Sequence, residues 1–313
     1  MIKKISIIGG GGTVGSATAF CLGWKSICEE VVLFDKAYKL ALHHMSDIGC
    51  SICKSSKTRI AATENAADIA SSDIVIVAAS FPTGEGGAFS ASDELVSALA
   101  EIAGVLRDYA QDSVVFTLSN PVDVINTMLW KLSGLRAKQF VGFSLNDSIR
   151  LDMAIAEYAG CDPQDVTSYC IGEHGFSKVP VLNCVSIRGV KRSFSDDEAE
   201  RIQKIAFDHW MEFLRLGINR TAGWSTGVYV EACLEALAEA KDEALECSVI
   251  LDGEYGYKGL SFGTPVHLCL KGVSKVIELN LNEREKGLLH NSYELVQSRV
   301  DELVSRAKEA NLL

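Results

Sequence analysis

The chain of 313 residues lacks any apolar run near the roughly 20 residues that a membrane-spanning helix needs. It lacks a recognisable signal peptide too, because the apolar segment Ile2–Ile8 is short, contains Lys3 and Lys4, and runs directly into glycines. Positive charge is in deficit, with 30 Lys and Arg against 41 Asp and Glu and a net charge of −11. This balance argues against contacts with nucleic-acid phosphates or anionic lipid. We therefore expect no nucleic-acid partner and no membrane partner.

A cysteine framework is also absent, although the chain has ten cysteines. Cys50 and Cys53 form a single CxxC pair without a second pair at zinc-finger spacing, so we predict no metal site. A redox or metal role for this pair stays open as the alternative to plain thiols. Scattered, reduced cysteines are typical of cytoplasmic proteins, and we predict that location.

No repeat, low-complexity segment or Pro/Ser-rich linker divides the chain, so its length predicts two closely packed domains. In the first half, short apolar runs alternate with helical patterns. These runs are Lys4–Ile8, Glu30–Asp35, Asp73–Ala79 and Ser113–Leu118. Continuous apolar strands separated by helices are typical of a parallel sheet covered on both faces.

The second half mixes helical and strand patterns differently. The expected helices are Asp196–Ile218, Gly227–Glu239 and Asn282–Ala310, and the expected strands are Cys247–Leu251 and Val266–Leu270. We therefore predict an α/β fold with two domains. A Rossmann-type, doubly wound parallel sheet occupies residues 1–144, and a C-terminal α+β substrate domain occupies residues 145–313.

A glycine-rich loop follows the first expected strand. The run Gly10-Gly11-Gly12-Thr13-Val14-Gly15 fits G-x-G-x-x-G between a strand and a helix, the context in which this pattern binds a dinucleotide. Gly10 would permit the tight turn, Gly12 the approach of a pyrophosphate, and Gly15 the close packing of helix on strand. The helix begins at about Thr13 and Val14, where backbone N–H groups face the anion.

The choice of dinucleotide depends on Asp35, at the end of the second expected strand. A carboxylate there accepts hydrogen bonds from the ribose hydroxyls and repels a 2′-phosphate. The sequence therefore predicts NAD, rather than NADP, as the cofactor.

A candidate catalytic group lies at Gly172-Glu173-His174-Gly175, downstream of Asp147 and Arg150. Imidazole exchanges a proton near neutral pH, and a carboxylate on its other nitrogen fixes the tautomer and stabilises the imidazolium. A guanidinium offers a planar fork to a substrate carboxylate. Together with NAD, the three side chains predict hydride transfer between a 2-hydroxy acid and its 2-oxo acid.

These motifs, in this order, resemble the L-lactate/malate dehydrogenase family nearly end to end. The matching segments are Gly10–Gly15, Asp35, Ser119–Asp123, Asp147–Arg150, Gly172–Gly175 and Gly223–Gly227. The resemblance implies that His174 donates and accepts the proton, that Asp147 is its partner, and that Arg150 clamps the substrate carboxylate. It places Asn120 between nicotinamide and substrate, before a proline that is cis in the family. It also implies a homodimer or homotetramer.

One residue of the family pattern is missing. The resemblance implies an Arg on a mobile loop, where it polarises the substrate carbonyl, but the loop Phe81–Glu94 contains neither Lys nor Arg. The position that selects the substrate side chain falls at Pro82 or Thr83, and neither is charged. Two interpretations stay open: an NAD-dependent dehydrogenase with an unusual or narrow substrate, and a degenerate relative that binds NAD with little turnover.

Overall fold

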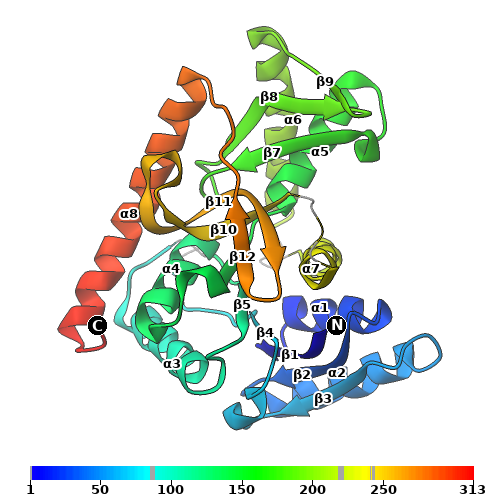
Figure 1. The fold of residues 1–313 in the computed structure, drawn as a ribbon, viewed down its shortest axis with the longest axis vertical. Helices are drawn as coiled ribbons and strands as arrows, with labels where there is room; N and C mark the ends of the chain where they lie inside the picture. Colours follow the sequence, from blue (N-terminus) through cyan, green and yellow to red (C-terminus); the bar gives the residue numbers. More distant parts are fainter. Residues whose placement is uncertain (1, 85–88, 218–221, 240, 242–243) are drawn as a thin grey trace.

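A computed structural model describes residues 2–84, 89–217, 222–239, 241 and 244–313 (Figure 1). Nine strands form one sheet in the order β12-β11-β10-β6-β5-β4-β1-β2-β3. Six of them are parallel to one another: β1 Ile2–Ile8, β2 Cys28–Phe34, β3 Arg59–Thr63, β4 Ile74–Val77, β5 Val114–Thr117 and β6 Phe140–Phe143. The spatial order 3-2-1-4-5-6 is that of a Rossmann sheet, which binds its ligand where the order reverses between β1 and β4.

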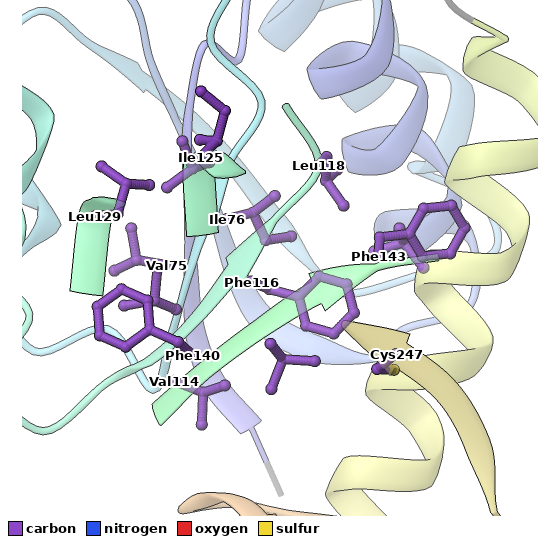
Figure 2. Packing of buried hydrophobic residues seen from close by; sticks show 14 of the residues in the cluster. Val75, Ile76, Val114, Phe116, Leu118, Ile125, Leu129, Phe140, Phe143 and Cys247 are labelled. Carbon is purple, nitrogen blue, oxygen red and sulfur yellow. The ribbon is translucent and has the colours of Figure 1, made fainter. Parts of the chain in front are cut away.

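Helices connect these strands and cover the sheet. They are α1 Thr13–Trp24, α2 Tyr38–Ile52, α3 Asp93–Tyr109 and α4 Val122–Ser133, with short 3-10 turns at Ala66–Ile69 and Ala137–Gln139. The central strands β4, β5 and β6 are short and fully buried because both faces of the sheet are covered, and Figure 2 shows the packing around Val75, Phe116 and Phe140. The predicted fold class is confirmed.

The second half contributes to two sheets. Strands β10 Leu245–Asp252, β11 Lys258–Cys269 and β12 Gly272–Val276 extend the large sheet, and strands β7 Val166–Ile171, β8 Val179–Ile187 and β9 Val190–Lys191 form a smaller antiparallel sheet. Because β10 pairs antiparallel with β6, residues beyond 145 complete the sheet of the first half. The strand expected at Val266–Leu270 is the end of the longer β11.

The helices of the second half are α5 Asn146–Ala159, α6 Asp196–Arg215, α7 Gly223–Glu239 and α8 Glu283–Glu309, with 3-10 turns at Pro163–Asp165 and Glu254–Gly256. The helix expected to reach Ile218 ends at Arg215, and Ile218 lies outside the described residues. In Figure 1 the small sheet with α5 and α6 lies at one end of the molecule, and α8 runs along its side. Within the described ranges, no helix has the length and apolar character to cross a membrane.

Two glycines one turn apart bring α7 against α1, the helix that follows the glycine loop. A Cβ atom added to Gly227 would lie 2.9 Å from the Ala17 carbonyl oxygen and 3.1 Å from Cys21 Sγ. At Gly223 it would lie 3.1 Å from Thr13 Cγ2. The segment Gly223–Gly227 therefore has a structural purpose, which is the close approach of these two helices.

We predict that Gly227→Ala lowers the free energy of unfolding by about 1–3 kcal/mol, because the added methyl group must displace backbone atoms of α1. Gly287→Ala is the matched control, since Gly287 is exposed on α8 and a Cβ atom there meets nothing within 4 Å. That variant should gain up to about 1 kcal/mol from helix propensity. Urea denaturation measures both, and equal stabilities would contradict the close packing of α1 on α7.

Candidate active site

The glycine loop closes tightly between β1 and α1. Gly9 takes the left-handed conformation (φ +87°), and a Cβ atom there would lie 2.7 Å from the Ala78 backbone. Gly10 lies inside the tight turn that the Gly12 N–H closes on the Gly9 carbonyl oxygen at 3.1 Å. A Cβ atom on Gly10 would lie 2.8 Å from Leu33 Cα, so the turn packs directly on β2. A Cβ atom on Gly15 would lie 2.3 Å from the Gly9 carbonyl oxygen, so helix and loop pack without a side chain between them.

The start of α1 fits a pyrophosphate. Gly12 is the N-cap residue and provides no side chain to cap the helix, so the N-terminal turn that begins with Thr13 and Val14 keeps N–H groups for an anion.

Asp35 lies beside this loop. Its Oδ2 accepts the Gly11 N–H at 2.8 Å, and its Oδ1 accepts the Ala37 N–H at 2.8 Å. The carboxylate lines a pocket at the carboxyl ends of β1, β2 and β4, closed on the far side by α3. An ion pair between Lys36 and Glu101, 2.7 Å long, joins two residues of this lining. The pocket lies at the switch point of the sheet, where a parallel α/β fold holds a nucleotide.

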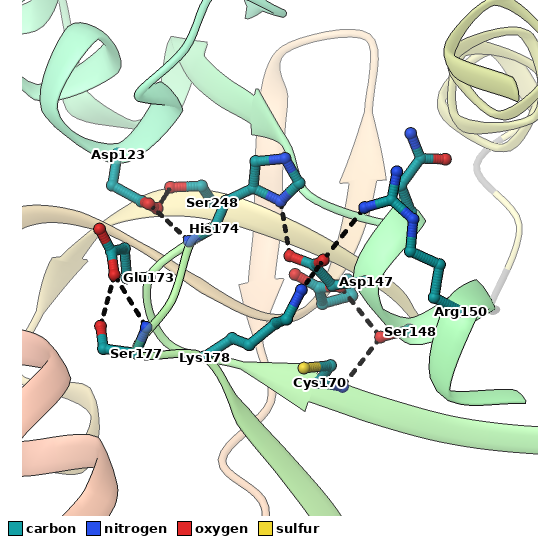
Figure 3. Close-up of polar contacts among 12 residues, drawn as sticks. Asp123, Asp147, Ser148, Arg150, Cys170, Glu173, His174, Ser177, Lys178 and Ser248 are labelled. Atoms are coloured by element: carbon teal, nitrogen blue, oxygen red, sulfur yellow. Dashed lines mark hydrogen bonds and ion pairs between the residues drawn. The ribbon is translucent and has the colours of Figure 1, made fainter. Parts of the chain in front are cut away.

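The second group of predicted residues also meets in space (Figure 3). His174, which follows β7, places Nδ1 2.6 Å from Asp147 Oδ2. Arg150, one turn after Asp147 on α5, places Nη1 3.5 Å from Oδ1 of the same carboxylate. Lys178 was not predicted, yet its Nζ lies 2.7 Å from Asp147 Oδ1.

A second buried carboxylate holds the His174 backbone. Asp123 Oδ2 accepts the His174 N–H at 2.7 Å, and Asp123 Oδ1 accepts the Ser248 hydroxyl at 2.5 Å. Asp123 belongs to α4, three residues after Asn120, and the Asn120–Pro121 peptide bond is cis. Asn120 itself is exposed at the carboxyl end of β5. The segment after β5 is thus tied directly to the backbone of the histidine.

The charges around His174 set its protonation. Burial lowers the pKa of His174, but the charge and hydrogen bond of Asp147, with the charges of Asp123 and Glu246, outweigh burial and raise it above the ordinary value. Burial raises the pKa of Asp147, but the charges and hydrogen bonds of His174 and Lys178 outweigh burial and hold this pKa well below its usual range. Asp147 is therefore a carboxylate at neutral pH, and it favours the imidazolium form of His174.

Two further carboxyl groups near His174 titrate high. Burial raises the pKa of Asp123 to about 6, and burial together with the Asp147 charge raises the pKa of Glu246 to about 8. Glu246 Oε2 accepts the Ser148 hydroxyl at 2.9 Å, one residue from Asp147. Asp123 was part of the matching segment Ser119–Asp123 without an assigned role, and Glu246 was not named from the sequence.

The substrate loop is described in part, and Glu85–Ala88 lie outside the described residues. Ser92 accepts the Leu95 N–H and begins α3, so its hydroxyl caps a helix. Phe89 carries the Arg299 guanidinium over its ring, at 5.4 Å from the centroid. Arg299 comes from α8 and pairs with Glu173, the neighbour of His174. A guanidinium does therefore meet the loop, but α8 supplies it.

Comparison with known proteins assigns the chain to the nicotinamide-dependent dehydrogenases. Residues 3–142 match the family described as lactate/malate dehydrogenase, NAD binding domain, and residues 145–306 match lactate/malate dehydrogenase, alpha/beta C-terminal domain. The chain belongs to the lactate/malate dehydrogenase family, and its cofactor is NAD. The predicted family and cofactor are confirmed.

The similarity to relatives and to solved structures extends over nearly the whole chain. Malate dehydrogenase of Pseudomonas putida is 32% identical over 309 residues, covering 96% of this chain and 99% of the relative. Malate dehydrogenase of Natronomonas pharaonis is 30% identical over 307 residues, covering 96% and 100%. The Cryptosporidium parvum lactate dehydrogenase complexed with lactic acid and NAD is 28% identical, with a TM-score of 0.87 and coverage of 97% and 98%.

We predict that NADPH binds at least about tenfold more weakly than NADH, because the Asp35 carboxylate would face a 2′-phosphate. A tenfold difference corresponds to about 1.4 kcal/mol, a small demand on one like-charge contact. Titration of NADH and NADPH fluorescence measures it. Asp35→Asn is the informative variant, since an amide oxygen can still accept the Gly11 N–H while the charge is lost. This variant should reduce the ratio of NADH affinity to NADPH affinity. Equal affinities in the unmodified protein would remove Asp35 from the ribose site.

Proposed function

We propose that the protein is an NAD-dependent dehydrogenase (EC 1.1.1.-) that interconverts a 2-hydroxy acid and its 2-oxo acid, with His174 as the proton donor and acceptor. The observation that carries this proposal is the 2.6 Å contact between His174 Nδ1 and the buried Asp147 carboxylate. Because Nδ1 is engaged, Nε2 is the nitrogen left to exchange a proton with substrate.

Each residue has a chemical task in this proposal. NAD, when bound, supplies the acceptor for the two electrons and the hydrogen that leave C2 of the hydroxy acid. His174 Nε2 takes the hydroxyl proton in that direction and returns it in the reverse direction. Asp147 stabilises the imidazolium that forms. Arg150 holds the substrate carboxylate by two parallel hydrogen bonds, and Asn120 borders the site from the end of β5.

The raised pKa of His174 gives a direction for the dependence on pH. Reduction of an oxo acid needs the imidazolium, so its rate is sustained above the ordinary histidine range and is lost as pH rises through the folded-state pKa. Oxidation of a hydroxy acid needs neutral imidazole, so its rate rises through the same pKa.

We predict that His174→Asn abolishes turnover and leaves NADH affinity within a few fold, since the imidazole exchanges the proton and does not hold the nucleotide. Arg150→Lys should chiefly raise KM, because an ammonium cannot form the two-point fork. Steady-state kinetics and NADH titration check both variants. More than a tenth of the wild-type rate in His174→Asn would make His174 structural and end this proposal.

The substrate we propose is a monocarboxylic 2-oxo acid with an uncharged side chain. The relatives that are 30–32% identical to this chain are malate dehydrogenases, whose oxo acid has a second carboxylate. Here Pro82 and Thr83 carry no charge to pair with it, and the only charges of the loop are Glu85, Asp93 and Glu94. The alternative function is an NAD-binding relative with little turnover, which the missing loop Arg favours and the His174–Asp147 contact disfavours.

We predict poor turnover of both pyruvate and oxaloacetate, because a cation aimed at the carbonyl oxygen is typically worth about 10²–10³ in rate. Oxaloacetate should be the worse, since neither Pro82 nor Thr83 offers a charge to pair with its second carboxylate. Arg placed at Ala88 or Phe89 should raise the pyruvate rate, and Phe89→Gln is the neutral control. NADH oxidation at 340 nm measures all of these. Wild-type turnover of oxaloacetate at ordinary malate-dehydrogenase rates would refute this substrate assignment.

We also propose a cytoplasmic location, a homodimer or homotetramer, and a division into an NAD-binding domain at 1–144 and a substrate domain at 145–313. The ten cysteines are free, and Cys50 and Cys53 are exposed at the end of α2, which supports a reducing location. Trp224 and Val228 on α7 are exposed apolar side chains, which favours burial against a second copy.

A further inference from the structure

Lys178 meets the catalytic carboxylate at its second oxygen. The residue follows the turn after His174 and precedes β8, and its Nζ lies 2.7 Å from Asp147 Oδ1. The Lys178 side chain is 31% exposed, and the Asp147 carboxylate only 4%. Figure 3 shows Lys178 and Arg150 reaching the same carboxylate from different sides. The resemblance to the family assigned no role to this lysine.

The charges that face His174 come from several elements. Asp147 and Arg150 lie on α5, Asp123 on α4, Glu246 on β10, and Lys178 at the start of β8. Glu173 is committed to Arg299 of α8 and to the Ser177 hydroxyl. Three carboxyl groups thus face the imidazole, and the cations nearest Asp147 are Lys178 and Arg150. Lys178 is the one that makes a hydrogen bond.

Arg150 and Lys178 compete for one oxygen atom. Asp147 Oδ2 is taken by His174, so Oδ1 is the remaining acceptor. Lys178 Nζ occupies it at hydrogen-bond distance, whereas Arg150 Nη1 stands off at 3.5 Å, beyond a normal N–H···O bond. A buried carboxylate needs a partner at each oxygen. Without Lys178, the guanidinium one turn along α5 is the cation placed to supply it.

We propose that Lys178 is a positioning residue that saturates Asp147 Oδ1, so that Asp147 orients His174 through Oδ2 alone while the Arg150 fork stays available to the substrate carboxylate. The part concerning Arg150 and substrate rests on the proposed function. The part concerning the Asp147 carboxylate rests on the contacts alone.

Removing the ammonium has two consequences with defined signs. The Lys178 charge near the imidazolium is lost, and Arg150, which already lies 3.5 Å from Oδ1, replaces only part of its compensation of the Asp147 charge, so the pKa of His174 rises. Arg150 moves onto Oδ1, which withdraws part of its fork from the substrate, so KM rises more than kcat falls.

The test compares Lys178→Met, Lys178→Arg and Lys191→Met. Lys178→Met keeps most of the side-chain volume and removes the charge, and Lys178→Arg restores a cation. Lys191→Met is the matched control, because Lys191 is exposed on β9 and its loss changes the net charge equally. The His174 ring is titrated by NMR in the protein without substrate. Pyruvate-dependent oxidation of NADH gives KM and kcat.

We expect Lys178→Met to raise the His174 pKa by about one pH unit and the pyruvate KM by about tenfold. Lys178→Arg should bring the His174 pKa most of the way back to its wild-type value. Lys191→Met should match wild type in both the His174 pKa and the pyruvate KM. A His174 pKa unchanged in a folded Lys178→Met protein overturns the inference, and so does a fall in kcat at constant KM. A wild-type protein that reduces no 2-oxo acid overturns the proposed function instead, and the NMR titration still tests Lys178.

Discussion

The burial of one ionised carboxylate, that of Asp147, is the constraint around which the rest of the site is arranged. An isolated charge with 4% exposure would be strongly unfavourable, so it must be paired and hydrogen-bonded. Its partners come from separate places: His174 and Lys178 flank the turn between β7 and β8, and Arg150 follows on α5 itself. The packing of α5 against the small sheet brings them together, and the same pairing gives His174 its orientation and its raised pKa.

The second buried carboxylate, Asp123, connects this group to the nucleotide half of the molecule. It lies on α4, directly after the Asn120–Pro121 bond at the end of β5, and it accepts both the His174 N–H and the Ser248 hydroxyl. Asp123 on α4 thus fixes the histidine backbone, and Asp147 on α5 fixes the imidazole. Hydrogen transfer between nicotinamide and substrate requires the histidine to be held in a fixed position relative to the nucleotide half, because small displacements of the reacting atoms strongly reduce the rate.

The parts predicted well from sequence are those written in local patterns. Apolar runs between helices indicated the parallel strands, and the glycine run indicated the loop between β1 and α1. The motifs around Asp147, Arg150 and His174 indicated one group of side chains, which the structure brings together, and their chemistry stays a prediction. Contacts between distant segments left no local pattern. Lys178 stands 31 residues from Asp147, and Ser248 stands 125 residues from Asp123, so neither pairing could be inferred. The glycine pattern does not show which residue of the loop is left-handed, and only the backbone identifies it as Gly9.

The loop Phe81–Glu94 contains neither Lys nor Arg, and Arg299 of α8 places a guanidinium over the ring of Phe89 in its described part. The central claim is that hydrogen moves directly from the nicotinamide to C2 of a 2-oxo acid. Its most direct test is to incubate the protein with NADH that carries deuterium at both C4 positions of the nicotinamide and a panel of monocarboxylic 2-oxo acids, and to analyse the products by mass spectrometry and NMR. We expect one deuterium at C2 of a 2-hydroxy acid, and the absence of any C2-deuterated 2-hydroxy acid with every acid in the panel would contradict direct transfer.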